Sequence, residues 1–413
     1  MTFSRRVLGS FSQRSLIMKT TAKIFLSAIL CLFCLTSFAE FDVRQMNKKF
    51  GINLFQDANI WDDSGSNLMQ RLGAKFQTTK AGNKTISATY AKGKVLKAEI
   101  EQLRITEIDG KVAQIDMVFF NKGDSVEGKK WTQKLQREMM QQWQILETSL
   151  NEIAGKSTNG TWGFGRTKNK AKIWKFENYM FNLEFKPKEF IILHIIHPDF
   201  AKQAAKKQTA SDTFDGKKNV SKEPNGDIYI ENIPMVDQGP KGYCVPATIE
   251  RCLKYYNITD VDMHKIAAVC DTRVGGGTTI DSVMTDFKKV CNTFKLKMSN
   301  VSGFSINSIA AKIDNGIPIG WTLFATDDFL KRMIANSDKR ANSNFTDYCK
   351  DLKTQDKLKK RMQNPHICLI IGYNKKSKEI AVSNSWGDRF KIHWVRFDDA
   401  KVVARNAFVI NPR

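Results

Sequence analysis

Residues 238–247 read QGPKGYCVPA, and residues 384–387, far downstream, read NSWG. The first stretch continues as IERCLKYY, where apolar side chains recur at the i, i+3, i+4, i+7 spacing of a buried helix face: Ile249, Cys252, Leu253 and Tyr256. Pro246 suits the first turn of a helix, where its missing N–H costs nothing. The pattern therefore predicts a core helix whose N-terminus carries Cys244.

A cysteine in that position can serve as a nucleophile if its thiolate is accessible. Few thiols are ionised at neutral pH, but a helix N-terminus and a nearby imidazolium both lower a thiol pKa. His366 opens the strand-like run HICLIIGYN, which a polar turn joins to EIAVSNSWG. Two adjacent strands would bring His366 to Asn384, which would orient the imidazole ring. We therefore predict one site formed by Cys244, His366 and Asn384, with a lowered thiol pKa.

This order of residues, Gln238-x5-Cys244, then His366 heading an apolar strand, then NSWG, resembles a papain-like cysteine peptidase. The resemblance implies that Cys244 is the nucleophile, His366 the base and then the acid, and Asn384 the residue that orients the ring. It also implies that Gln238 donates to the oxyanion together with the backbone N–H of Cys244. Trp386 would shield the His–Asn hydrogen bond from water.

Two further stretches narrow the resemblance. The Cys-x-Pro-Ala run at 244–247 and IAAKIDNGIPIGWTLFA at 309–325 are similar to the bacteriocin-processing (double-glycine) peptidases and their exported bacterial relatives. Those relatives usually have aspartate as the third catalytic residue, whereas this chain has a papain-type Asn384. The resemblance covers residues 230–413 and implies an α+β fold. Its nucleophile would lie on a core helix packed on an antiparallel sheet.

Two other segments of this half are ambiguous. VGGGTTIDSVMTDFKKV at 274–290 is a glycine loop that opens a helix. By the resemblance, Gly276 and Gly277 would line the cleft and pair with substrate backbone; the alternative is a simple turn. The charged, helix-prone segment 326–363 is either a lid over the cleft or a solvated surface excursion.

Composition divides the chain into four parts. Residues 1–39 contain a basic stretch, an apolar run and a small-residue end, which are typical of a signal peptide, with a membrane anchor as the alternative. Residues 40–200 form an N-terminal α+β domain, residues 201–226 have the polar composition of a linker, and residues 227–413 form the papain-like domain. We therefore expect an exported protein, secreted or periplasmic.

The N-terminal domain shows alternating strand patterns, with Asp109–Gly110 suited to a hairpin turn, and a helical pattern over 131–155. His194 and His197 are three residues apart in a strand-like run, which places them on opposite faces. They therefore make a poor metal pair and are expected to be core or surface residues. The sequence leaves open whether this domain is an inhibitory pro-segment or a binding module.

The net charge of +23 is spread along the chain without a dense Arg/Lys run, so nucleic-acid binding is not expected. Attraction to an anionic cell surface is favoured instead. No cysteine or histidine spacing suits a metal, and no cofactor is predicted. The preferred function is an exported cysteine peptidase acting on a peptide or protein. The alternatives are an idle papain-like module that binds peptide or cell-wall material, and an acyl transferase of the same fold.

Overall fold

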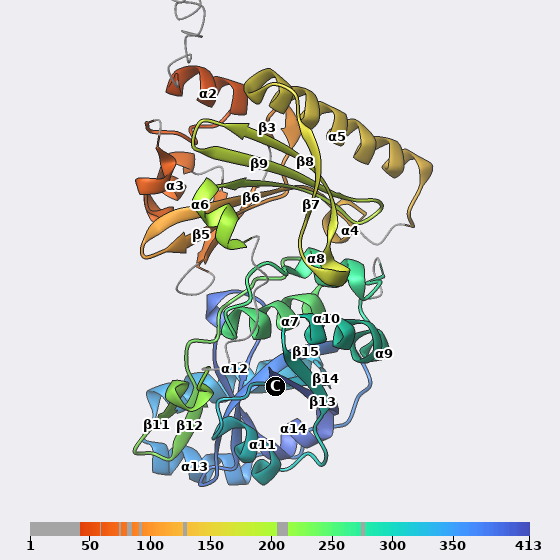
Figure 1. Cartoon of the computed structure of the whole chain (residues 1–413). Helices are drawn as coiled ribbons and strands as arrows, with labels where there is room; N and C mark the ends of the chain where they lie inside the picture. Colours follow the sequence, from red (N-terminus) through yellow and green to blue (C-terminus); the bar gives the residue numbers. More distant parts are fainter. Residues whose placement is uncertain are drawn as a thin grey trace, which may run out of the picture.

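The computed structural model describes residues 42–413 except 58, 74–75, 81–84, 91–92, 127–129, 205–213 and 274–276. For 76–80, 85–90 and 202–204 it describes the backbone alone. The predicted signal peptide lies outside the described residues. The chain folds into two bodies, each built on an antiparallel sheet with helices packed against it, which confirms the predicted α+β class (Figure 1). None of the described helices is long and apolar enough to cross a membrane.

The first body contains an eight-stranded sheet in which every neighbouring pair is antiparallel. Its strand order is β1 (Phe76–Lys80), β2 (Thr85–Tyr90), β5 (Gln102–Ile108), β6 (Lys111–Asn121), β10 (Phe190–Ile196), β9 (Tyr179–Lys186), β8 (Asn169–Phe176) and β7 (Thr158–Trp162). A separate short hairpin joins β3 (Lys94–Val95) to β4 (Ala98–Glu99). The predicted turn between β5 and β6 is present: Asp109 and Gly110 both have positive φ, 52° and 77°, as a type I′ hairpin requires.

The long helix α5 (Gln133–Ala154) packs against this sheet. Thr132 caps its N-terminus by accepting a hydrogen bond from the Leu135 N–H, and Met139 and Leu146 are among its buried residues, as the helical spacing predicted. The other helical segments of this body are α2 (Val43–Phe50), α3 (Gly65–Leu72), α4 (Lys122–Ser125), α6 (Pro198–Ala204) and the short 3-10 helices Ile60–Asp62 and Gly165–Thr167.

The second body has its own eight-stranded sheet. The main path is β11 (Val220–Lys222), β12 (Asp227–Ile230), β15 (Pro365–Asn374), β14 (Ile319–Phe324), β18 (Ala404–Pro412) and β13 (Leu296–Asn300). Strand β16 (Glu379–Ser383) pairs with both β15 and β17 (His393–Arg396). Strand β15 is thus central in the sheet. Gly372 on β15 permits the close approach of β12, because a Cβ on Gly372 would lie 2.7 Å from the Ile228 carbonyl oxygen.

Helix α7 (Cys244–Tyr255) begins at Cys244, where the sequence predicted a helix, and packs against β15 and α8 (Met263–Val269). Its predicted apolar face is buried, but Glu250 and Arg251 are also fully buried, so the helix is enclosed on every side. The remaining helical segments are α9 (Ile280–Ser282), a π-helical turn (Val283–Phe287), α10 (Lys288–Thr293), α11 (Ile306–Ile313), α12 (Asp327–Asn342), α13 (Phe345–Thr354), α14 (Phe397–Val403) and the 3-10 helices Gly216–Asn219 and Asp388–Phe390.

The segment expected to be a linker, residues 201–226, has regular structure at both ends. Helix α6 covers its first residues, and β11 pairs antiparallel with β12, so residues 220–222 are part of the second sheet. Residues 205–213 lie outside the described part of the chain. A polar composition indicated a linker, but a short edge strand needs few apolar side chains.

Residues 326–363 contain α12 and α13, and α12 packs against β17. Near the end of α12, Arg340 donates to both carboxylate oxygens of Asp227, and Asp227 pairs with Asn374. Asn374 and His366 lie toward opposite ends of β15. The end of this helix is therefore anchored away from His366, whereas the two ends of the segment adjoin His366, because Phe324 pairs with Pro365 and the Ala325 N–H donates to the Asn364 carbonyl. The lid over the cleft stays a prediction.

Candidate active site

The ends of two neighbouring strands bring His366 and Asn384 together. His366 is the second residue of β15, Asn384 directly follows β16, and the two strands pair antiparallel. The His366 Nε2 lies 2.8 Å from the Asn384 Oδ1. Because an amide oxygen only accepts hydrogen bonds, the contact requires a proton on Nε2. It therefore leaves Nδ1 of His366 as the basic nitrogen.

Trp386 covers one face of the histidine ring. The two ring centroids are 4.4 Å apart with an interplanar angle of 23°, a stacked arrangement. Asn384 is 3% exposed and its N–H donates to the Phe390 carbonyl. The His–Asn hydrogen bond is therefore shielded from water on the Trp386 side, and the ring has little freedom to turn.

Cys244 lies beside this pair, half-buried at the start of α7. Burial raises the pKa of its thiol, and the backbone N–H groups of Val245 and Ile367 oppose that rise only in part. Ile367 directly follows His366, so the sulfur lies at the beginning of β15. Burial also lowers the pKa of His366 to about 4, although its contact with Asn384 acts in the opposite direction.

These shifts differ from the expected lowering of the Cys244 pKa. The helix N-terminus and the two N–H groups do favour the thiolate, but loss of hydration at this buried position outweighs them. In the uncomplexed protein the favoured pair is therefore a neutral thiol and a neutral imidazole. His366 can then take the thiol proton as the sulfur attacks.

Gln238 is tied to the NSWG segment by two contacts. Its backbone N–H donates to the Ser385 carbonyl at 2.9 Å, and the Ser385 hydroxyl donates to its side-chain Oε1 at 2.8 Å. Its Nε2 donates weakly, at 3.4 Å, to the Lys241 carbonyl. Ser385 thus holds the amide oxygen, which keeps the NH2 group toward the loop that leads to Cys244.

Of the two glycines expected to line the cleft, Gly276 lies outside the described residues. Gly277 forms an isolated bridge with Arg273 and has a φ of +68°, a conformation that favours glycine. Its backbone packs beside Gly242, since a Cβ on Gly242 would lie 3.8 Å from the Gly277 Cα. Gly277 therefore borders the Cys244 loop, and its contact with substrate stays a prediction.

Arg251 is a structural residue that the sequence did not single out. It is fully buried on α7, and its guanidinium donates to the Pro234 carbonyl at 2.8 Å and to the Ser383 carbonyl at 3.1 Å. Burial lowers its pKa to about 10. Ser383 directly precedes Asn384, so Arg251 fixes the nucleophile helix against the strand end that carries the third residue of the site.

A cavity of about 500 Å3 lies between α9 and the strand β14. Its walls include Ile280, Met284, Phe304 and Trp321, with Asp281 and Arg405 also lining it. Trp321 is fully buried and its indole Nε1 has no hydrogen-bond partner. On the paired strands Trp321 faces Cys368 and Leu323 faces His366, so the indole and the imidazole share one face of the sheet.

We expect iodoacetamide to modify Cys244 ever faster as the pH rises through 9, because burial raises the thiol pKa above its ordinary value of 9.0. Among the cysteines of residues 42–413, Cys349 is the other half-buried thiol, so a Cys349→Ser background in the chain beginning at Glu40 isolates the signal. Cys252, Cys270, Cys291 and Cys368 are at most 1% exposed and should react only after unfolding. Mass spectrometry of tryptic peptides provides the rates. A rate that is already constant below pH 7 would instead indicate a thiolate–imidazolium pair.

Comparison with known proteins identifies similarity in the second body. Residues 230–407 match the Peptidase_C39 like family. Among solved structures, the chain is similar to xylellain, a cysteine protease from Xylella fastidiosa, at 11% identity over 51% of this chain and 92% of that one. The TM-score is 0.27, so no functional conclusion rests on that similarity. No curated protein matches the chain.

Proposed function

We propose that this chain is a cysteine peptidase of the papain-like superfamily that hydrolyses peptide bonds in peptides or proteins, because residues 230–407 match the Peptidase_C39 like family. The observation that carries the proposal is the His366–Asn384 hydrogen bond under Trp386, beside a cysteine that starts a core helix. Each residue then has a separate task.

Acylation begins when the Cys244 sulfur attacks the scissile carbonyl carbon while Nδ1 of His366 takes the thiol proton. The carbonyl π electrons move to oxygen, and the Cys244 N–H and the Gln238 side-chain NH2 donate to this oxyanion. The carbonyl then re-forms and the C–N bond breaks. The imidazolium gives its proton to the leaving amine, so the first product departs neutral and the acyl group remains on sulfur.

Hydrolysis of the thioester reverses these roles. His366 removes a proton from water as the water oxygen attacks the acyl carbon, and the sulfur leaves and regains the proton. Asn384 accepts from Nε2 throughout, which keeps Nδ1 toward the reacting atoms.

Export of this enzyme, secreted or periplasmic, is part of the proposal and rests on the sequence of residues 1–39 alone. The basic charge of +23 supports contact with an anionic cell surface. Export and cell-surface contact are tested separately from catalysis. Cell fractionation shows where the protein is located, and the length of the mature chain shows whether the N-terminal segment has been removed.

We expect an epoxide inhibitor of papain-like enzymes to label the chain beginning at Glu40 once, at Cys244, and to stop its cleavage of an unfolded protein substrate. Cys244→Ala should lose both labelling and cleavage, whereas Cys349→Ser, the matched change at the other half-buried thiol, should keep both. Peptide mapping locates the label. Labelling without cleavage but with transfer to an added amine would indicate an acyl transferase. No labelling and no cleavage would indicate an idle binding module.

A further inference from the structure

The loop from Gln238 to Cys244 is held by the N-terminal body. Lys241, three residues before the nucleophile, forms an ion pair with Asp124 of α4, with its Nζ 2.5 Å from the Asp124 Oδ2. The Lys241 side chain is 5% exposed and that of Asp124 22%. A lysine so completely withdrawn from water depends on its partner, because an unpaired buried ammonium is strongly disfavoured.

Tyr243, adjacent to the nucleophile, makes a second contact with the same turn of the N-terminal body. Its ring lies against Gly123: a Cβ on Gly123 would be 2.8 Å from two ring carbons and 3.0 Å from the Lys241 Cβ. Tyr243 is 2% exposed, and burial raises its hydroxyl pKa. The absence of a side chain at Gly123 is therefore what lets α4 approach the loop.

Asp124 is itself fixed in place. Asn121 caps α4, accepting from the Asp124 N–H at 2.9 Å and donating from Nδ2 to the Asp124 Oδ2 at 2.8 Å. Asn121 and Ser125 also donate to the Glu101 carboxylate. Burial and the neighbouring Asp124 raise the pKa of Glu101 to about 8. Asp124 is thus held by its hydrogen bonds with Asn121 as well as by the ion pair with Lys241.

The same lysine connects to the oxyanion donor through its backbone. The Lys241 carbonyl accepts from the Gln238 Nε2 at 3.4 Å and from the Tyr243 N–H at 2.7 Å. A shift of Lys241 would therefore move the amide of Gln238 and the residue that precedes Cys244 together. Because an oxyanion hole acts only when its donors are within a few tenths of an ångström of their places, the loop must be rigid.

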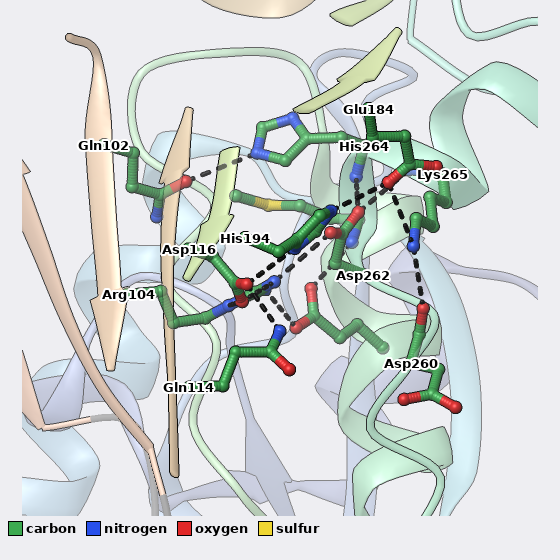
Figure 2. A network of polar contacts seen from close by, with 12 residues as sticks. Gln102, Arg104, Gln114, Asp116, Glu184, His194, Asp260, Asp262, His264 and Lys265 are labelled. Carbon is green, nitrogen blue, oxygen red and sulfur yellow. Dashed lines mark hydrogen bonds and ion pairs between the residues drawn. The ribbon is translucent and has the colours of Figure 1, made fainter. Parts of the chain in front are cut away.

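A second set of polar contacts, centred on Arg104, also joins the two bodies (Figure 2). Arg104, on β5, donates to Asp116 on β6 at 2.9 Å, to Glu250 on α7 at 3.1 Å and to Asp262 at the start of α8 at 3.2 Å. Glu250 lies on the same helix as Cys244. The N-terminal sheet is thus attached both to the nucleophile helix and to the loop before it.

The network around Arg104 also places the histidine that the sequence left unassigned. His194 is 1% exposed, with Nδ1 2.7 Å from Asp116 and Nε2 2.9 Å from Glu184. Lys265 of α8 reaches Glu184 at 3.3 Å (Figure 2). His194 is therefore a core residue of a buried, densely paired interface, one expected to hold the bodies in a single relative position.

We propose that Asp124 and Lys241 are positioning residues, through which the N-terminal domain holds the 238–244 loop in the geometry that stabilises the oxyanion. This inference rests on the proposed peptidase function. It makes the N-terminal domain part of the catalytic unit. The domain then acts neither as a segment that must be cut away nor as a module that only recruits substrate.

The test is Asp124→Asn in the full mature chain. We expect kcat on a peptide ester to fall about tenfold, a part of the 10²–10³-fold that a whole oxyanion donor contributes, with KM changed less than about twofold. Lys241→Met should have the same effect. Alkylation of Cys244 by iodoacetamide forms no oxyanion, so its rate should be unchanged. Arg166→Gln, which removes the interdomain contact of Arg166 with Asp286, should alter neither rate.

A double-mutant cycle identifies the route of the effect. In a Gln238→Ala background, Asp124→Asn should lose most of its effect on kcat, because the donor that it positions is already gone. Equal falls in the rates of turnover and of Cys244 alkylation would overturn the positioning role but not the peptidase function. An unchanged kcat in both Asp124→Asn and Lys241→Met would do the same. Absence of turnover and of epoxide labelling in the unmodified chain would overturn the proposed function and the inference together.

Discussion

His366→Ala is expected to lower turnover by about 10⁴-fold, the upper range for loss of a general base that is also the general acid. In the unmodified enzyme the neutral imidazole of His366 must take the thiol proton, since burial raises the Cys244 pKa and leaves little thiolate in the free enzyme. Asn384→Ala should cost less, because Trp386 still stacks on the ring at 4.4 Å and restricts it. The measurement is kcat/KM on a peptide substrate for the three chains.

His197→Ala is the matched control, a half-exposed histidine of the N-terminal body that should leave turnover unchanged. Circular dichroism separates loss of catalysis from loss of folding. Retained turnover in His366→Ala would show that another group acts as the base. Equal and complete loss in His366→Ala and Asn384→Ala, with loss of the dichroism signal, would indicate misfolding.

The pH profile of the unmodified enzyme follows from the same site. Burial lowers the His366 pKa to about 4, so the neutral, basic form is present above that pH. Below it the ring is protonated and cannot accept the thiol proton. Turnover should therefore fall as the pH drops through about 4.

Arg104→Ala is expected to destabilise the protein by about 3–5 kcal/mol, the usual effect of removing one member of a buried ion network. The change leaves Glu250, Asp262 and Asp116 without their shared cation, and each of these side chains is at most 3% exposed. Urea unfolding of the full chain measures the loss. Arg166→Ala, at an exposed interdomain pair, should cost less than about 1 kcal/mol.

The same network predicts how stability depends on pH. Burial disfavours the charged forms of Asp116 and Asp262, but Arg104 outweighs it and lowers the pKa of both. A carboxyl group with a lowered folded pKa stabilises above its unfolded value of about 4 and loses that contribution as the pH falls further. Arg104→Ala should therefore lose less additional stability between pH 5 and pH 3 than the unmodified chain. An equal loss in both would place the acid sensitivity elsewhere.

Much of this protein can be predicted from local patterns. Asp109–Gly110 has the residue types that a two-residue hairpin needs, and the spacing of Met139 and Leu146 describes one face of a helix. The contact of His366 with Asn384 follows from strand-like runs joined by a short turn. In each case the interacting residues are close in the sequence or recur at a short, regular spacing. The residue types that cause the turn, the helix face or the strand pairing can therefore be recognised in the sequence.

Only the tertiary structure decides which charged residues are buried and with which partners. Lys241 and Asp124 are 117 residues apart in the chain, and Arg104 and Glu250 are 146 apart. In the sequence each resembles an ordinary solvated charge, because nothing nearby signals burial. The raised pKa of Cys244 has the same origin: a helix N-terminus is visible in the sequence, but desolvation depends on atoms brought together by folding.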